Sequence, residues 1–344
     1  MDQMQSAQAV AFAPLICTDR IEETVDAATF CFRTADASPL GYKPGQFITF
    51  QVDVADEQLH RAYSLSSTPS RPESIAITVK RVPGGKVSNH LLDHLRPGHM
   101  LPGMAPAGEF NLIDCRATSK VLLFSAGSGI TPCISIARWL LDTDPQAEIH
   151  FIYSARTAAD VIMADELARL DAEHPNFNLE RVLSQPETSA DHQGRLDQSL
   201  FDRLVPEVAG YSLFTCGPAE YMATVKTCAQ ARGLDMDYFH QESFAPGAAN
   251  DEGVDSGVSY QLQAPKFGKA ASINGGQSLL EVMEGAGLPV IGACRSGVCG
   301  SCKCQVLAGE VDSSSQATLT DAEIAAGYVL ACSSKARSDL VVEL

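Results

Sequence analysis

Residues 292–304 read Gly-Ala-Cys-Arg-Ser-Gly-Val-Cys-Gly-Ser-Cys-Lys-Cys, and Cys332 follows in Tyr-Val-Leu-Ala-Cys-Ser. Cys294-x4-Cys299-x2-Cys302 with a distant fourth cysteine is the ligand spacing of a plant-type [2Fe–2S] site, in which four thiolates hold two irons. The glycines of this stretch supply the permissive backbone that a loop needs to wrap round a cluster and point N–H groups at its sulfurs. We therefore predict an iron–sulfur domain at this end of the chain.

Two other uses of these cysteines compete with a cluster. Cys299-x2-Cys302 alone would suit half of a zinc site or a redox dithiol, but zinc usually needs a second close pair, and none follows. A disulfide framework is disfavoured because the N-terminus has no secretory leader. Cys304 is interpreted as a small buried residue on the strand that leaves the loop. A cluster of this kind moves single electrons, so the rest of the chain is expected to supply a donor or an acceptor.

Length and composition indicate a soluble protein of two or three domains, because 344 residues exceed what one core usually serves. No apolar run approaches the roughly 18 residues of a membrane span. The cysteine usage and the N-terminus favour the cytoplasm. The net charge of −17 argues against nucleic acid and anionic membrane as partners. This acidic surface either keeps the protein soluble or steers it towards a basic patch on an electron-accepting protein.

The rhythm of apolar residues divides the chain. Short β-rich runs separated by Pro-Gly turns fill residues 24–107 and predict an antiparallel barrel, with one helix at 87–95. After Lys120, strands alternate with helices at 133–141, 164–172 and 219–231, which predicts a parallel α/β sheet. The predicted divisions are a loose tail (1–13), the barrel (14–113), the α/β domain (114–244), a flexible linker (245–257) and the cluster domain (258–344).

Two stretches of the barrel can hold a phosphorylated ligand. On a strand, Arg61 and Tyr63 of Arg-Ala-Tyr-Ser face one way and Ser64 faces the other. They offer a bidentate donor fork, a flat aromatic face and a hydroxyl for a ring nitrogen. Gly84-Gly-Lys-Val-Ser-Asn89 then opens the single helix and forms an anion cradle suited to a diphosphate. The alternatives are an ordinary strand, and a helix capped by Ser88 or Asn89.

The loop Gly127-Ser-Gly-Ile-Thr-Pro132 lies between a buried strand and a helix, where α/β sheets bind a dinucleotide pyrophosphate. Thr-Pro replaces the third glycine of the usual fingerprint. Pro132 suits the first helical turn, and Thr131 is expected to hydrogen-bond a phosphate or the nicotinamide carboxamide. After the second strand, Ser154 or Arg156 is expected at the adenosine ribose, unless Arg156 is a solvated loop charge. Few other cations lie nearby, which favours NADH over NADPH.

Two further stretches are placed at the reacting end of this site. Cys216-Gly217-Pro218 ends a strand at the carboxyl edge of the sheet, where the thiol would lie against the nicotinamide and the glycine would let it approach. The alternative is a buried turn cysteine. In His-Gln-Glu-Ser-Phe, Phe244 would cover a flavin ring and Glu242 would hydrogen-bond its reacting region, with a structural role for Glu242 as the alternative.

The order of these motifs resembles the ferredoxin–NADP reductase superfamily, and more narrowly its flavin reductases with a C-terminal [2Fe–2S] domain. Two subgroups are most similar. One comprises reductase components of Rieske oxygenases that demethylate glycine betaine-like quaternary amines, and the other the NADH oxidoreductase of the hybrid cluster protein. The motifs that carry the resemblance are Arg61–Ser64, Gly85–Asn89, Gly127–Pro132, Cys216–Pro218 and the four spaced cysteines.

The resemblance implies a β-grasp ferredoxin domain behind the barrel and the α/β domain, and bound FAD rather than the FMN of some related dioxygenase reductases. Ala105–Phe110 and Gly85–Asn89 resemble FAD-type members. The implied flavin contacts are Arg61, Ala62, Tyr63, Ser64, Gly85, Lys86, Val87, Ser88 and Phe244. The implied nucleotide contacts are Gly127, Ser128, Gly129, Thr131, Pro132, Arg156, Cys216, Gly217 and Pro218.

The predicted function is electron transfer from NAD(P)H through flavin and cluster to a separate protein, such as a terminal oxygenase, with Ser64, Cys216 and Glu242 at the reacting centre. The cofactors carry the chemistry, and the protein binds and orients them. A non-enzymatic redox carrier or sensor is one alternative. A self-contained oxidoreductase acting on a small molecule is another, although no domain is left over to bind such a substrate.

Overall fold

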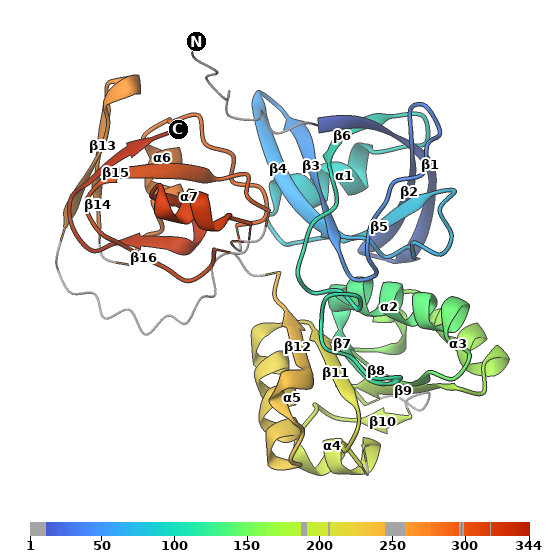
Figure 1. The fold of residues 1–344 in the computed structure, drawn as a ribbon. Helices are drawn as coiled ribbons and strands as arrows, with labels where there is room; N and C mark the ends of the chain where they lie inside the picture. The colour runs from blue at the N-terminus through green and yellow to red at the C-terminus, as the bar shows by residue number, and fades with distance from the viewer. Residues whose placement is uncertain are drawn as a thin grey trace.

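The computed structural model describes residues 12–186, 191–205, 207–244, 259–274, 276–295, 297, 299–316 and 318–344. It contains three domains (Figure 1): the N-terminal barrel, the α/β domain beneath it, and the cysteine-rich domain beside the barrel. The predicted fold class is confirmed. The predicted linker and residues 1–11 of the predicted tail lie outside the described residues.

The barrel is one antiparallel sheet in the order β4-β3-β6-β1-β2-β5. Alternate residues point inward, so Phe30, Phe32, Ile48 and Phe50 are fully buried. A bridge between Leu65 and Ile77 partly closes the sheet. The elements are β1 (Phe12–Thr24), β2 (Ala27–Thr34), β3 (Phe47–Val54), β4 (Glu57–Ser64), β5 (Ile75–Lys80), α1 (Lys86–His94) and β6 (Met100–Met104).

The second domain is a parallel sheet in the order β10-β9-β8-β7-β11-β12. Its central strands are apolar on both sides because α2 and α3 cover one face and α4 and α5 cover the other. The elements are β7 (Lys120–Ala126), α2 (Ile130–Thr143), β8 (Glu148–Ala155), α3 (Ala164–Glu173), β9 (Phe177–Leu183), β10 (His192–Gln193), α4 (Gln198–Leu204), β11 (Ser212–Cys216), α5 (Ala219–Ala231) and β12 (Phe239–Glu242), with 3₁₀ turns at Gly127–Gly129, Ala158–Asp160 and Met236–Tyr238.

The third domain holds a five-stranded sheet in the order β14-β13-β19-β15-β17 and a separate pair, β16-β18. Leu279, Leu280 and Met283 of α6 pack onto the sheet, together with Cys302, Cys304 and Cys332. The elements are β13 (Tyr260–Ala264), β14 (Lys269–Ile273), α6 (Leu279–Gly285), β15 (Lys303–Ala308), β16 (Val311–Ser313), α7 (Asp321–Ala325), β17 (Tyr328–Leu330), β18 (Ser334–Ala336) and β19 (Leu340–Glu343), with 3₁₀ turns at Pro265–Phe267 and Ala331–Ser333.

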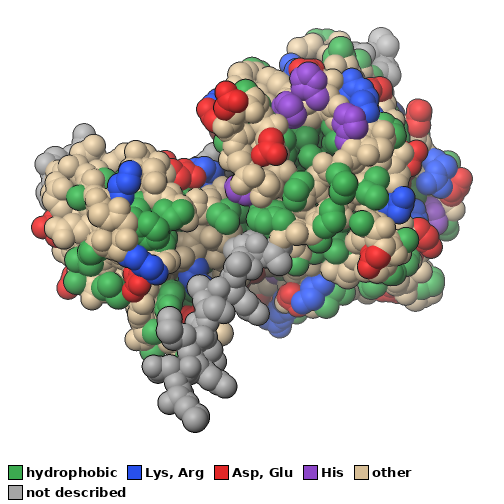
Figure 2. Space-filling model, turned by 90° about the horizontal axis from the view of Figure 1, so that it is seen from above, with side chains coloured by type: hydrophobic (Ala, Val, Ile, Leu, Met, Phe, Trp, Pro, Cys, Tyr) green, Lys and Arg blue, Asp and Glu red, His purple; other side chains and the backbone are tan. Residues whose placement is uncertain are grey.

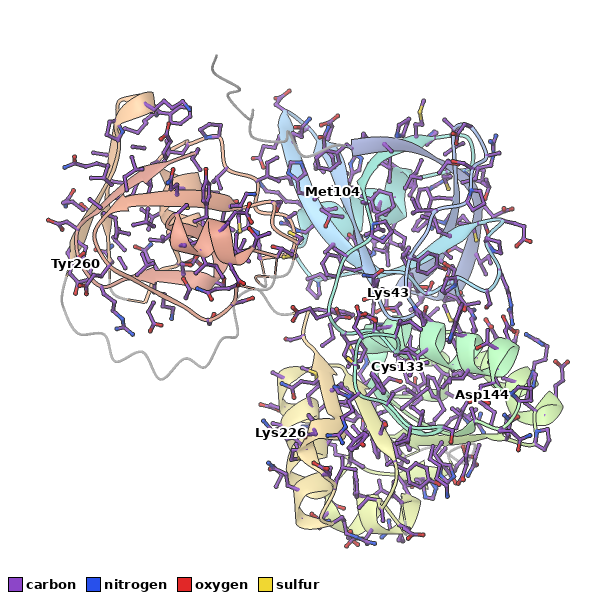
Figure 3. All side chains as sticks on the ribbon, in the orientation of Figure 1. Lys43, Met104, Cys133, Asp144, Lys226 and Tyr260 are labelled. Carbon is purple, nitrogen blue, oxygen red and sulfur yellow. The ribbon has the colours of Figure 1, made fainter. Side chains whose placement is uncertain are left out.

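The junction between the first two domains is tied near its covalent connection. The ammonium of Lys43 lies 2.6 Å from each carboxylate oxygen of Asp114, and Figure 3 shows Lys43 where the barrel meets the α/β domain. Charged side chains of both signs are interspersed over the face seen in Figure 2, with no extended patch of one sign on the described surface of that view. Among the described helices, none combines the length and the apolar character needed to cross a bilayer.

Candidate cofactor and electron-transfer site

The strand β4 carries the predicted flavin motif at its end. Tyr63 lies opposite Ile48 and Ser64 opposite Phe47 on β3, and burial raises the pKa of Tyr63 above its usual range. The guanidinium of Arg61 donates to the carbonyl of His60 at 2.7 Å, and no carboxylate among the described residues pairs with it. A half-buried cation without an acidic partner fits a phosphate group, which a guanidinium binds through two parallel hydrogen bonds.

The N-terminus of α1 also suits an anion. Its N-cap residue is Gly85, and no side chain caps it. The alternative, in which Ser88 or Asn89 caps this helix, is not what forms: the Ser88 hydroxyl accepts a bond from the backbone N–H of Val82 at 3.2 Å instead. The backbone N–H groups of the first turn therefore stay open to a ligand. Val87 is buried in the barrel core, and Lys86 lies on the surface 2.7 Å from Glu57.

The loop after β7 is held by contacts that its glycines permit. Gly127 has a φ of +55° and open space where a Cβ would be, and its carbonyl accepts a bond from the Tyr153 hydroxyl at 3.0 Å. A Cβ on Gly129 would overlap the backbone carbonyl of Cys216. The Thr131 hydroxyl donates to the carbonyl of Ser128 at 3.0 Å, so its lone pairs are what it can offer a ligand.

Gly217 allows a second close approach, because its Cβ would lie 3.1 Å from the Tyr221 ring and the Ala126 methyl. Pro132 stands in the first turn of α2 and Pro218 is the N-cap residue of α5. Tyr153 and Tyr221 were not among the predicted site residues. A tyrosine that packs beneath a loop cannot be recognised as a site residue from the sequence around it, because it looks like one more apolar core residue.

Arg156 lies at the edge of this region. Its side chain is 65% exposed and pairs with Asp160 at 2.7 Å. Asp160 also closes a capping box with Thr157. Of the two interpretations of Arg156, a ribose contact or a solvated loop charge, this arrangement matches the second. The positive charge of Arg156 is already paired.

The three residues predicted at the reacting centre lie together. Cys216 is the last residue of β11 and lies in register with Glu242 at the end of β12. The Ser64 hydroxyl donates to Oε2 of Glu242 at 3.2 Å and thereby joins the barrel to the α/β domain. Burial raises the pKa of the Cys216 thiol well above its ordinary value, so this thiol stays protonated. Phe244 follows two residues after Glu242, with 47% of its surface exposed.

Glu242 also faces the cysteine-rich domain. The pKa of Glu242 is raised to about 8, chiefly by burial; the hydrogen bond from Ser64 acts in the opposite direction, and the negative charge of Cys294 adds to the rise. This influence indicates that the cysteine loop lies near the pair formed by Ser64 and Glu242. All three domains therefore contribute to one place in the molecule.

Within the cysteine loop, the four predicted ligands reach one another. Contact with Cys294 raises the pKa of Cys299, contacts with Cys294 and Cys302 raise that of Cys332, and hydrogen bonds from Cys332 lower that of Cys302. The described residues contain no group of three or more ligands already arranged for a single metal ion. The contacts instead run from Cys299 through Cys294 and Cys332 to Cys302, and a cluster of two irons takes two thiolates on each iron.

Backbone N–H groups point at these sulfurs, as the glycines predicted. Gly297 donates to the sulfur of Cys332 at 3.2 Å, and Cys332 donates to that of Cys302 at 3.4 Å. Gly297 has a φ of +77°, and a Cβ there would lie 2.7 Å from the Ser315 side chain. Such N–H···S bonds stabilise thiolates, so the loop fits a [2Fe–2S] cluster. Cys304 is buried on β15, as expected.

Three family models match the chain in succession. They are an oxidoreductase FAD-binding domain over residues 14–112, an oxidoreductase NAD-binding domain over 123–227 and a 2Fe-2S iron-sulfur cluster binding domain over 266–337. The chain belongs to the ferredoxin–NADP reductase superfamily. It is an oxidoreductase of the branch with a C-terminal [2Fe–2S] domain, and its cofactors are FAD, a nicotinamide dinucleotide and the cluster, which confirms the cofactor prediction.

Relatives of this reductase cover almost its whole length. The glycine betaine monooxygenase reductase subunit of Pseudomonas aeruginosa is 36% identical and covers 95% of this chain and 94% of its own. The NADH oxidoreductase HCR of Escherichia coli is 40% identical, covering 93% of this chain and 94% of its own. The solved structure of phthalate dioxygenase reductase is 25% identical with a TM-score of 0.65, covering 97% of this chain and 98% of that one.

Proposed function

We propose that this reductase carries electrons from NADH to the Rieske oxygenase component of a monooxygenase or demethylase that acts on a quaternary amine. The observation that carries the proposal is the hydrogen bond from Ser64 of the barrel to Glu242 of the α/β domain, near enough to Cys294 of the third domain for its charge to act on Glu242. The choice of acceptor is supported by the similarity to the glycine betaine monooxygenase reductase subunit.

The residues divide into two binding roles and one reacting centre. When bound, the dinucleotide supplies a hydride, FAD accepts the electron pair, and the [2Fe–2S] cluster passes electrons on singly. Arg61 and the open N-terminus of α1 hold phosphate oxygens. Gly127, Gly129 and Thr131 seat the dinucleotide, with the exposed face of Gly127 against it.

At the reacting centre the side chains bind, orient and exclude water. Ser64 presents its hydroxyl to the reacting edge of the flavin, and Glu242 accepts from that hydroxyl and fixes its direction. Cys216, uncharged and buried, provides a surface for the nicotinamide, and Phe244 covers the ring from the exposed side. Cys294, Cys299, Cys302 and Cys332 hold the cluster.

NADH is the proposed donor rather than NADPH. A 2′-phosphate needs an unpaired cation at the end of β8, and Arg156 there is paired with Asp160. The two dinucleotides should therefore differ in kcat/KM in favour of NADH. A higher value for NADPH would refute this assignment.

The experiment that tests the proposed function is done under nitrogen with purified protein. NADH should bleach the flavin absorbance and generate the EPR signal of a reduced [2Fe–2S] cluster. A protein whose flavin ignores NADH would instead be a redox carrier or sensor. The reduced reductase is then mixed with a Rieske oxygenase component and glycine betaine, and the demethylated product is measured. Reduction of the flavin and cluster without any product would refute the proposed acceptor.

A second acceptor is favoured by one observation, the 40% identity to the NADH oxidoreductase HCR. Hybrid cluster protein is therefore the competing acceptor in the same assay. Faster oxidation of the reductase by hybrid cluster protein than by the oxygenase component would move the assignment to that pathway.

A further inference from the structure

One face of α2 is a polar stripe turned towards the barrel. Thr131, Ser135, Arg138 and Asp142 recur at helical spacing and share that face. The helix begins directly after the Gly127–Gly129 turn, so any movement of α2 moves the dinucleotide loop with it. Any segment that the stripe contacts is therefore connected to the nucleotide loop through α2.

Three residues of this stripe, Ser135, Arg138 and Asp142, contact residues 66–71, the segment that follows β4 and its flavin motif. The Ser135 hydroxyl donates to the carbonyl of Ser67 at 2.6 Å. Arg138 donates to the carbonyl of Ser66. Asp142 accepts from the Ser70 hydroxyl at 2.6 Å and forms an ion pair with Arg71 at 2.7 Å.

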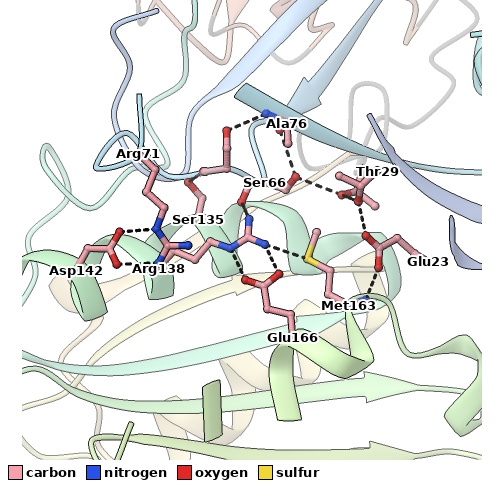
Figure 4. A network of polar contacts seen from close by, with 12 residues as sticks. Glu23, Thr29, Ser66, Arg71, Ala76, Ser135, Arg138, Asp142, Met163 and Glu166 are labelled. Carbon is pink, nitrogen blue, oxygen red and sulfur yellow. Dashed lines mark hydrogen bonds and ion pairs between the residues drawn. The ribbon is translucent and has the colours of Figure 1, made fainter. Parts of the chain in front are cut away.

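Arg138 is itself fixed from a second helix. Its Nε donates to Oε1 of Glu166 on α3 at 2.8 Å, and a second bond joins the same two groups. The two side chains are only 13% and 23% exposed. A bidentate pair with this little solvent access holds the guanidinium plane in one orientation. Figure 4 shows Arg138 between Glu166 and the barrel segment at Ser66.

The network closes on itself across the domain boundary (Figure 4). Arg138 donates to the sulfur of Met163 at 3.9 Å, and the backbone N–H of Met163 donates to Glu23 of β1 at 3.0 Å. Met163 has a φ of +57°, a backbone conformation that side chains of its size rarely adopt unless their surroundings impose it. Glu23 returns to Ser66 through the hydroxyls of Thr29 and Thr78.

We infer that Arg138, locked by Glu166, is a positioning residue for hydride transfer: it holds the nucleotide loop at a fixed distance from the flavin strand. The inference rests on the electron-donor half of the proposed function and is independent of the acceptor. Arg138 touches neither cofactor motif directly. It acts by clamping the helix behind one motif to the segment behind the other.

The test uses anaerobic stopped-flow reduction of the complete, FAD-loaded protein by NADH. Arg138→Met should lower the limiting rate of flavin reduction by about ten- to a hundredfold, since small misplacements of reacting groups have effects of this size. The half-saturating NADH concentration should change less than about threefold, because the lost interaction orients rather than binds. Arg138→Lys should restore part of the rate.

Arg169→Met is the matched control. Arg169 lies on α3, the helix that carries Glu166, and forms an exposed ion pair with Glu173. Its substitution should leave the rate of flavin reduction unchanged. A folded Arg138→Met protein with the wild-type limiting rate would overturn the inference. So would a change in the half-saturating NADH concentration alone. If Arg138→Met fails to fold, Asp142→Asn breaks the outer end of the clamp and should slow reduction severalfold; an unchanged rate there overturns it equally. Wild-type protein that NADH does not reduce would count against the proposed function instead.

Discussion

Gly129→Ala tests how closely the nucleotide loop must approach β11. The backbone of Gly129 is right-handed helical, with φ −63° and ψ −7°, so alanine adopts it without strain. The new methyl group would overlap the carbonyl of Cys216 and would lie 2.7 Å from the nitrogen of Gly217, and both are backbone that cannot rotate away. Any effect of this substitution therefore measures the contact itself.

The size of the effect follows from that contact. Adding a methyl group to a closely packed position lowers the free energy of unfolding by about 1–3 kcal/mol. Each kcal/mol lowers the melting temperature by roughly 2–4 °C in a domain of 150–250 residues. Because the loop must move away from Cys216, the proposed seat of the nicotinamide moves as well. A shift of roughly 1 Å at a reacting centre costs about a hundredfold in rate.

Gly127→Ala is the matched comparison two residues earlier. There the methyl group meets open space, but a φ of +55° costs an alanine about 1–2 kcal/mol. Its methyl group would project into the space assigned to the dinucleotide, so its effect should appear in the half-saturating NADH concentration. Thermal unfolding and stopped-flow reduction measure both variants. A Gly129→Ala protein as stable and as fast as wild type would refute the proposed contact.

Three further outcomes are expected. Because burial raises the pKa of Glu242 to about 8 from an ordinary 4.5, the folded protein retains a proton that the unfolded chain has released. Stability should therefore fall as pH rises through this window, and Glu242→Gln should remove that fall in urea unfolding at pH 6 and pH 9; parallel curves for the two proteins would contradict the raised pKa. Arg61→Met should weaken FAD binding about ten- to a hundredfold, the value of a lost charge-assisted hydrogen bond of about 1.5–3 kcal/mol, measured by fluorescence titration; unchanged affinity would remove Arg61 from the phosphate site. Cys332→Ser should abolish the EPR signal of the cluster while NADH still bleaches the flavin, and a variant that keeps the EPR signal would remove Cys332 from the cluster ligands.

Local spacing carried the parts of the site that sequence could predict. Several functional groups lie within a few residues of one another in the cysteine loop, the Arg61 strand and the Gly127 loop. Each of these sites can therefore be recognised from one short stretch of sequence. The helix at 219–231 and the strand at 212–215 matched closely for the same reason, since their apolar periods are strong. Sequence was sufficient wherever the residues that bind a ligand and the residues that set the backbone conformation belong to the same turn.

Contacts that depend on packing were beyond such reading. Ser135, Arg138 and Asp142 form a polar stripe, and from sequence alone a polar stripe reads as the solvent face of a helix. Only the placement of the barrel above α2 converts it into an interface. Likewise β12 was not predicted, because its four residues, Phe239–Glu242, are made a strand by pairing with β11 rather than by their own preference.

Ser64, Cys216 and Glu242 meet because each lies at the end of a strand. β4, β11 and β12 all stop there, so these three side chains are brought to one point by elements that are rigid up to that residue. Glu242 accepts a hydrogen bond from Ser64 and is also subject to the charge of Cys294 in the cluster domain. The covalent connection makes transfer from flavin to cluster an intramolecular event, which raises the effective concentration of one partner for the other without a large interface. A reductase built this way needs a strong clamp only between the flavin and nucleotide domains, where hydride transfer demands fixed geometry, and that is where the Arg138 network lies.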